Sequence, residues 1–121
     1  MRHNNRPKIG TKMYTVQEHL YYIPGYPAPV TEYCVCEGEV KRFFTAGYTE
    51  IILVGPSPEG YTTPYRYPLR KIGKRVFYTA EEAALLAKDM TERHEHTWGW
   101  IGEPAFPMRR PWEKYLVKEE N

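Results

Sequence analysis

Two cysteines and two histidines are the residues of this chain best suited to binding a metal ion. They are Cys34, Cys36, His94 and His96. Structural zinc sites use thiolates and imidazoles, but with C-x2–4-C and H-x3–5-H spacings that are missing here. If a helix continues through His96, the two imidazoles point in nearly opposite directions. The remaining candidate set is Cys34, Cys36 and His94. We favour two free core thiols, one core histidine and no metal or other cofactor.

Nucleophilic catalysis has one candidate arrangement, a cysteine activated by a histidine. Nothing around Cys34 or Cys36 resembles an activated-cysteine motif. The phosphate-binding patterns G-x-x-x-x-G-K and G-x-G-x-x-G and the metalloprotease pattern H-E-x-x-H are also absent from the sequence. Because a catalytic site requires several converging groups, we expect that the protein is not an enzyme.

Basic and aromatic residues alternate between residues 61 and 78, a composition that is typical of nucleic-acid binding. The candidate nucleic-acid or nucleotide site consists of Tyr65, Arg66, Tyr67, Arg70, Lys71, Lys74 and Arg75. On a strand, Tyr65 and Tyr67 point to the face opposite Arg66. The alternation therefore also fits tyrosines in a core and arginines in solvent. Nucleic-acid or nucleotide binding is the alternative function.

The C-terminal segment, residues 98–121, is aromatic and interrupted by prolines. It contains tryptophan, methionine and arginine, which are enriched at the centres of protein interfaces. The candidate partner-binding residues are Trp98, Trp100, Phe106, Met108, Arg109, Arg110 and Trp112. This tail either packs on the core of its own chain or forms an interface, and a short last helix is expected over Pro111–Glu119.

The strongest structural signal is the segment Lys71–Arg93, which predicts a strand over Arg75–Tyr78 followed directly by a helix. Thr79 and Glu82 have the spacing of a capping box. The apolar face expected on this helix consists of Ala80, Ala83, Leu86, Ala87, Met90 and His94. We therefore expect a lid helix over about residues 80–94 that covers a sheet.

The chain before this helix predicts β-strands separated by turns. The expected strands are Ile9–Val16, Val30–Cys36, Glu39–Thr45, Tyr48–Val54 and Tyr61–Leu69. Glu37-Gly38 is expected to be the turn of a hairpin, and Pro24–Pro29 a rigid loop. Lys8–Tyr14 is similar to Lys71–Phe77, and pairing of the first strand with the last would close the sheet into a small barrel.

Composition and length fit one folded domain. The chain has 121 residues, a net charge of +2 and 15% aromatic residues. No apolar run reaches the roughly 20 residues of a membrane span, and the N-terminus lacks the apolar stretch of a signal peptide. We expect a cytoplasmic protein with no membrane contact. Residues 1–97 are expected to form the sheet and the helix, and residues 98–121 the tail.

The segment Ile72–Ala83 carries a resemblance to a known group of proteins. Its sequence I-G-K-R-V-F-Y-T-A-E-E-A resembles a strand-to-helix ending, G-K-x-V-F-x-T-x-E-E-A, of small uncharacterised proteins from phages and mobile elements of Gram-positive bacteria. The resemblance implies an SH3-like β-barrel of the α+β class, followed by one helix, and no catalytic residues. It also implies a setting in which small proteins bind and inhibit host components, such as CRISPR effectors or other defence proteins. We therefore expect a non-enzymatic binding module that inhibits or modulates a host protein; its oligomeric state stays open.

Overall fold

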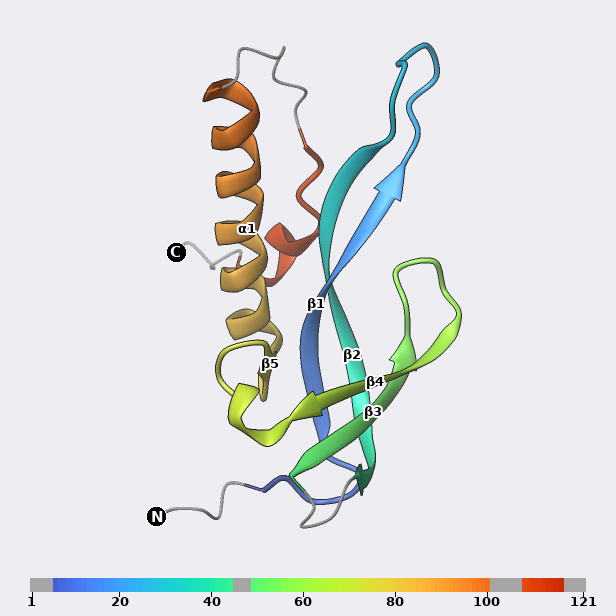
Figure 1. Cartoon of the computed structure of the whole chain (residues 1–121), viewed down its shortest axis with the longest axis vertical. Coiled ribbons are helices and arrows are strands. Elements are labelled where there is room, and N and C mark those ends of the chain that lie inside the picture. Colours follow the sequence, from blue (N-terminus) through green and yellow to red (C-terminus); the bar gives the residue numbers. More distant parts are fainter. Residues whose placement is uncertain (1–5, 45–48, 101–107, 117–121) are drawn as a thin grey trace.

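The computed structural model describes residues 6–44, 49–100 and 108–116 and contains an antiparallel sheet beside a long helix (Figure 1). The elements are β1 (Lys12–Tyr21), β2 (Val30–Phe44), β3 (Glu50–Pro56), β4 (Thr62–Pro68), the 3-10 turn η1 (Leu69–Lys71), β5 (Val76–Phe77), α1 (Ala80–Trp100) and the 3-10 turn η2 (Pro111–Tyr115). The strand order in the sheet is β4-β3-β2-β1-β5. The α+β class is therefore confirmed.

The expected SH3-like barrel is not confirmed, because the sheet is open over the described residues. The pairing of the first strand with the last, which was expected to close the sheet if it formed, does occur: Tyr14 lies opposite Phe77 and Thr15 opposite Val76. β4 and β5, however, stand at the two ends of the strand order. The short β5 covers part of one edge of β1 without closing the sheet.

The predicted hairpin turn at Glu37-Gly38 is wrong, because Val30–Phe44 is one continuous strand of 15 residues. Gly38 instead permits close approach of β3, since a Cβ atom there would lie 3.2 Å from the Cβ of Leu53. Gly55 on β3 has the same role, because its Cβ would overlap the carbonyl oxygen of Glu37. Glycine within a strand can mark such an approach instead of a turn.

β1 and β2 extend beyond the rest of the sheet as a two-stranded ribbon (Figure 1). The two strands pair from Lys12–Glu39 to Tyr21–Val30, whereas β3 pairs with β2 only from Glu39 onward. We call residues 16–38, including the loop 22–29, the ribbon. Because an isolated two-stranded ribbon is only marginally stable in water, it needs support from neighbouring elements.

That support comes from α1 and η2, which pack on one face of the ribbon. Ala84, Ala87 and Trp112 form a buried cluster there, and the partly buried ribbon residues against it are Val16, Tyr33 and Val35. The small alanine side chains bring the helix close to the strands. A separate core on the sheet proper consists of Met13, Val40, Ile51, Leu53 and Val76.

The lid helix is confirmed and is longer than expected, reaching Trp100 instead of about residue 94. At its N-terminus one bond of the predicted capping box is present, since the N–H of Glu82 donates to Thr79 Oγ1 over 3.2 Å. The Glu82 carboxylate reaches back as predicted but accepts from the Thr79 hydroxyl, over 3.0 Å. None of the described helices has the length and apolar character needed to cross a membrane.

Candidate functional site

The buried carboxylate of Glu32 is the centre of a polar cluster on the ribbon. Strand register places His19 directly opposite Glu32, and His19 Nδ1 lies 2.7 Å from Glu32 Oε2. Arg109 from the tail binds the same carboxylate with two donors, Nε to Oε1 at 3.0 Å and Nη2 to Oε2 at 3.1 Å. We call His19, Glu32, Cys34 and Arg109 the Glu32 cluster. A two-donor arginine contact is among the strongest pairings for a carboxylate.

Tyr21 completes the attachment of the tail to the ribbon. The guanidinium carbon of Arg109 lies 3.5 Å from the centre of the Tyr21 ring, and the Arg109 backbone N–H donates to the Tyr21 hydroxyl over 3.3 Å. Tyr21 is itself buried. The tail is therefore held by a stacked and hydrogen-bonded arginine as well as by Trp112.

Cys34 and Cys36 are free thiols on the same face of β2 as Glu32. Burial raises the pKa of Cys34 to about 12, and the charge of Glu32 adds to the rise. Burial also raises the pKa of Cys36 to about 11. Because the thiolate is the reactive form of cysteine, this environment disfavours nucleophilic chemistry at either sulfur.

The candidate metal set Cys34, Cys36 and His94 is not brought together. Side chains alternate along a strand, so Cys34 lies on the face of β2 opposite Tyr33. His94 is on the Tyr33 side, with its Nδ1 atom 3.2 Å from the Tyr33 hydroxyl. The structure instead places His19, Glu32 and Cys34 together, with one ligand atom of each within 4.8 Å of the others.

The predicted nucleic-acid residues divide between two environments. Tyr65 and Tyr67 pack against the core of the sheet, and the Tyr67 hydroxyl accepts a hydrogen bond from Gln17 over 3.1 Å. Arg66 points to the other face, where its Nε lies 3.1 Å from Glu50 Oε1 and its guanidinium lies over Phe44. Among the described residues, Glu50 Oε1 is buried without a hydrogen-bond partner, so the contact with Arg66 is an ion pair only. The tyrosines and this arginine do not form one groove.

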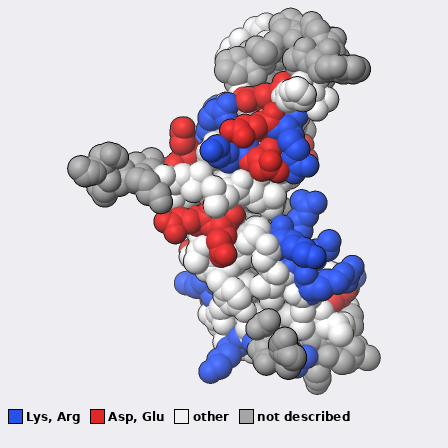
Figure 2. Space-filling view, turned by 90° about the vertical axis from the view of Figure 1, so that its left-hand side faces the viewer, with Lys and Arg blue, Asp and Glu red and all other residues white. Residues whose placement is uncertain are grey.

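The other four basic residues lie close together in the connection from η1 to β5. They are Arg70, Lys71, Lys74 and Arg75, and all but Lys71 are exposed. Within the described parts of the chain, none of the four has an acidic partner. Figure 2 shows a group of basic side chains below the mixed charges of the helix on this side of the molecule.

The described part of the tail packs on its own chain. Met108 is 7% exposed and Trp112 is 3% exposed. The Trp112 indole N–H donates to Thr91 Oγ1 over 3.0 Å, and Arg110 Nη2 donates to both Glu95 oxygens, at 2.8 and 3.0 Å. Phe106 lies outside the described residues. Trp98 and Trp100 belong to the last turn of α1, but the structure does not describe their side chains.

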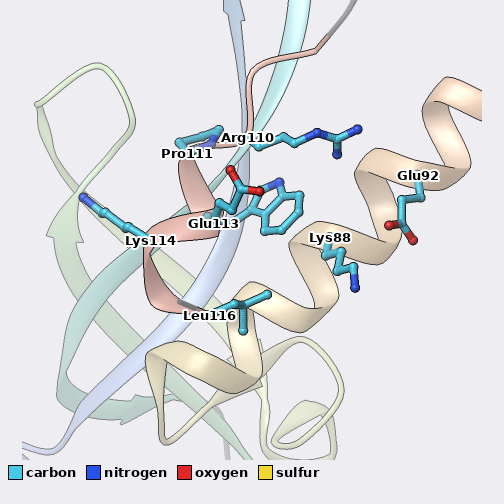
Figure 3. Close-up of a pocket in the computed structure, with 8 residues that line it drawn as sticks. Lys88, Glu92, Arg110, Pro111, Glu113, Lys114 and Leu116 are labelled. Atoms are coloured by element: carbon cyan, nitrogen blue, oxygen red, sulfur yellow. The ribbon is translucent and has the colours of Figure 1, made fainter. Parts of the chain in front are cut away.

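An open groove of about 850 Å³ lies between α1 and η2 (Figure 3). Lys88 and Glu92 line it from the helix, and residues 110–114 and Leu116 line it from the tail. Its charges are of both signs, so it favours no single class of charged ligand. This groove is a boundary between two packed elements and a weaker candidate than the Glu32 cluster.

The loop end of the ribbon exposes large apolar side chains. Leu20 is 51% exposed and Tyr22 is 77% exposed. They lie next to the loop 22–29, which contains Pro24, Pro27 and Pro29. These exposed apolar side chains on a projecting element make the loop end of the ribbon a candidate interaction surface.

Sequence reasoning missed His19 and Glu32 because they are 13 residues apart and no motif joins them. Their contact depends on the register of β1 against β2, and the expected first strand ended at Val16, which left His19 outside the pairing. The signal that could have found them is the proline-rich stretch: if it is the loop of a hairpin, residues flanking it at equal distance lie opposite each other. Comparisons with protein-family models, with curated proteins and with solved structures found no match.

Proposed function

We propose that the protein is a non-enzymatic binding module that binds a protein partner through the loop end of the ribbon. The observation that carries this proposal is the exposure of Tyr22 and Leu20 on an element that projects from the fold. Tyrosine is enriched at interface hot spots because it offers a large ring and one polar hydroxyl. The partner is expected to present an apolar pocket for Tyr22.

The prolines of the loop favour binding by limiting its freedom before contact. Proline fixes one backbone dihedral, so Pro24, Pro27 and Pro29 reduce the number of conformations that the loop loses on association. The same end of the molecule carries the last turn of α1 (Figure 1), to which Trp98 and Trp100 belong. With Phe106, these tryptophans remain candidate anchors. Arg109, Arg110, Met108 and Trp112 instead hold the tail on the fold.

The proposed partner is a host protein, and the proposed setting is the cytoplasm of a bacterium that carries a phage or mobile element. The support is the resemblance of Ile72–Ala83 to proteins of such elements, in which inhibition of CRISPR or other defence components is a frequent role. An SH3-like relationship is also proposed. Its support is the strand order, the 3-10 turn that precedes β5 and the pairing of β5 with β1.

A matched pair of tyrosine variants tests the proposal. Tyr22 is 77% exposed on the ribbon, and Tyr61 is 74% exposed beside the β3–β4 connection. Immobilised wild-type protein is incubated with nuclease-treated host lysate, and captured proteins are identified by mass spectrometry. Tyr22→Ala is expected to weaken capture of the partner by about 30-fold, the effect of a hot-spot residue, and Tyr61→Ala to leave it unchanged. Capture that is equally strong with both variants would exclude the ribbon as the binding surface.

Nucleic-acid or nucleotide binding is the second candidate. It is favoured by the four cations of the η1–β5 connection, which have no acidic partner among the residues that the structure describes. Phosphate contacts from such residues make affinity fall as salt is raised. Binding of a fluorescent oligonucleotide or nucleotide should then weaken steeply with salt and be lost in the Arg70→Ala/Lys74→Ala variant. Absence of binding at low salt would exclude this function.

A further inference from the structure

Three side chains of the Glu32 cluster carry the ligand types of a transition-metal site. The donor atoms of His19, Glu32 and Cys34 lie within 4.8 Å of one another on two adjacent strands. Imidazole nitrogen, carboxylate oxygen and thiolate sulfur are the three kinds of ligand that Zn²⁺ uses in proteins. Both strands are paired in this region, so the backbone already holds the three side chains on one face.

Arg109 is bound to the Glu32 carboxylate in this structure. Of the two residues, it is the one whose side chain can move into solvent. The Arg109 side chain is 56% exposed, whereas the Glu32 side chain is 9% exposed. A guanidinium that moves into water is hydrated again, while a carboxylate left buried without a cation is strongly disfavoured. The vacated place beside Glu32 therefore favours entry of another cation.

Glu59 lies beyond hydrogen-bond distance of His19 in this structure, but on the side of the ring where metal-binding histidines commonly have an acceptor. An ionised carboxylate only accepts hydrogen bonds, so in the Arg109-bound state His19 Nδ1 carries the hydrogen directed at Glu32. Glu59 Oε2 lies 3.9 Å from His19 Nε2, on the other side of the ring. A hydrogen on Nε2, directed toward Glu59, leaves Nδ1 with a free lone pair for a metal ion.

We propose that His19, Glu32 and Cys34 form a site for a thiolate-binding divalent metal ion such as Zn²⁺, and that this ion competes with Arg109 for the Glu32 carboxylate. When the ion binds, the Cys34 S–H bond breaks and a sulfur–metal bond forms, with release of one proton to solvent. The hydrogen on the His19 ring moves from Nδ1 to Nε2, so the ring neither gains nor loses a proton. The fourth coordination position is left to water.

Cobalt(II) absorption tests this site in the intact protein. Co²⁺ replaces Zn²⁺ in such sites, and a Co²⁺–thiolate bond gives a charge-transfer band in the near ultraviolet that carboxylate and imidazole ligands do not give. The band is expected in the wild-type protein and to disappear when Zn²⁺ is added. Cys36→Ser is the matched control, since Cys36 is the other thiol on the same face of β2 and should be dispensable. Cys34→Ser should abolish the band.

Arg109→Ala gives the result that separates competition from an ordinary metal site. Removal of the competing cation should tighten Co²⁺ binding by about tenfold or more, because the charge-assisted hydrogen bonds from Arg109 to Glu32 no longer have to be broken. Circular dichroism establishes that each variant is folded; if Cys34→Ser does not fold, His19→Gln replaces it and should weaken binding. The proposal is overturned by a wild-type protein without the band at saturating Co²⁺, by a band lost in Cys36→Ser but kept in Cys34→Ser, or by weaker binding in Arg109→Ala.

Discussion

Cys34 and Cys36 share one face of β2, and burial keeps both in the thiol form. The pKa is raised to about 12 for Cys34 and to about 11 for Cys36, from an ordinary value of 9.0. Burial therefore disfavours the reactive thiolate form at both positions, and both cysteines are free thiols, as the sequence predicted. Metal binding, as proposed for Cys34, is the route by which that thiol would lose its proton.

These raised pKa values predict a loss of stability at alkaline pH. Above about pH 9 the unfolded chain releases thiol protons that the folded protein retains until about pH 11 to 12. The free energy of unfolding contributed by the thiols is thus fully present below about pH 9 and falls as pH rises through this window. Urea denaturation at about pH 7.5 and at about pH 10 measures it.

The Cys34→Ser/Cys36→Ser variant is the control, because serine does not titrate in this range. Its stability should fall less between the two pH values than that of the wild-type protein. An equal fall in both proteins would show that other groups, such as tyrosines, account for the alkaline loss.

The chemistry of single residues was the part of the site least accessible from sequence. Glu32 carries no local sign of burial, and its partner Arg109 is 77 residues away. Arg109 and Arg110 were expected to bind a partner, and the structure shows each bound to a carboxylate of its own chain. Composition alone does not distinguish an arginine of an interface from one that fixes a tail.

Among the elements, α1 was predictable because its signals are local. The capping box, the alanine-rich apolar face and the Asp89–Arg93 ion pair, 2.7 Å long in the structure, all depend on residues within one or two helical turns. β2 was predicted wrongly for a related reason. Gly38 permits either a turn or a close strand contact, and the choice depends on β3, a separate element.

The docking of η2 on α1 predicts a large effect of Trp112 on stability. Trp112→Ala should lower the free energy of unfolding by about 3–5 kcal/mol, because it opens a cavity against Ala84 and Ala87. Trp112→Phe should cost less, since it keeps most of the ring volume and loses the hydrogen bond to Thr91, worth about 1 kcal/mol. Guanidinium denaturation measures both.

Tyr61→Ala is a suitable control for the Trp112 variants, because Tyr61 is exposed and should change stability little. If Trp112→Ala costs no more than Tyr61→Ala, the tail does not contribute to the folded core. The tail would then be available as an interface, the other interpretation that its sequence permits.

On the scale of the whole molecule, the sheet, α1 and the tail together support a projecting ribbon (Figure 1). α1 and η2 cover one face of the ribbon. The ion pair of Arg109 with Glu32 also ties the tail to the ribbon. The loop end remains exposed. This arrangement accounts for the presence of an aromatic tail without requiring the tail to be the binding surface.

Three features of the fold followed from the sequence: the α+β class, the lid helix and the possibility that the first strand pairs with the last. The expected closure of the sheet is wrong, because β4 and β5 stand at opposite ends of the strand order and do not pair among the described residues. The ribbon escaped prediction because Glu37-Gly38 was assigned to a turn, which divided β2 into two shorter strands.

The most direct test of the account is site-specific photocrosslinking from the ribbon. The photoreactive residue benzoylphenylalanine is placed at Tyr22 in one protein and at the equally exposed Tyr61 in another, and both are irradiated in host cells. If the ribbon binds a protein, a crosslinked partner is expected from position 22 and none from position 61. Crosslinking from position 61 alone, or from neither position, would contradict the proposal that the ribbon binds a protein partner.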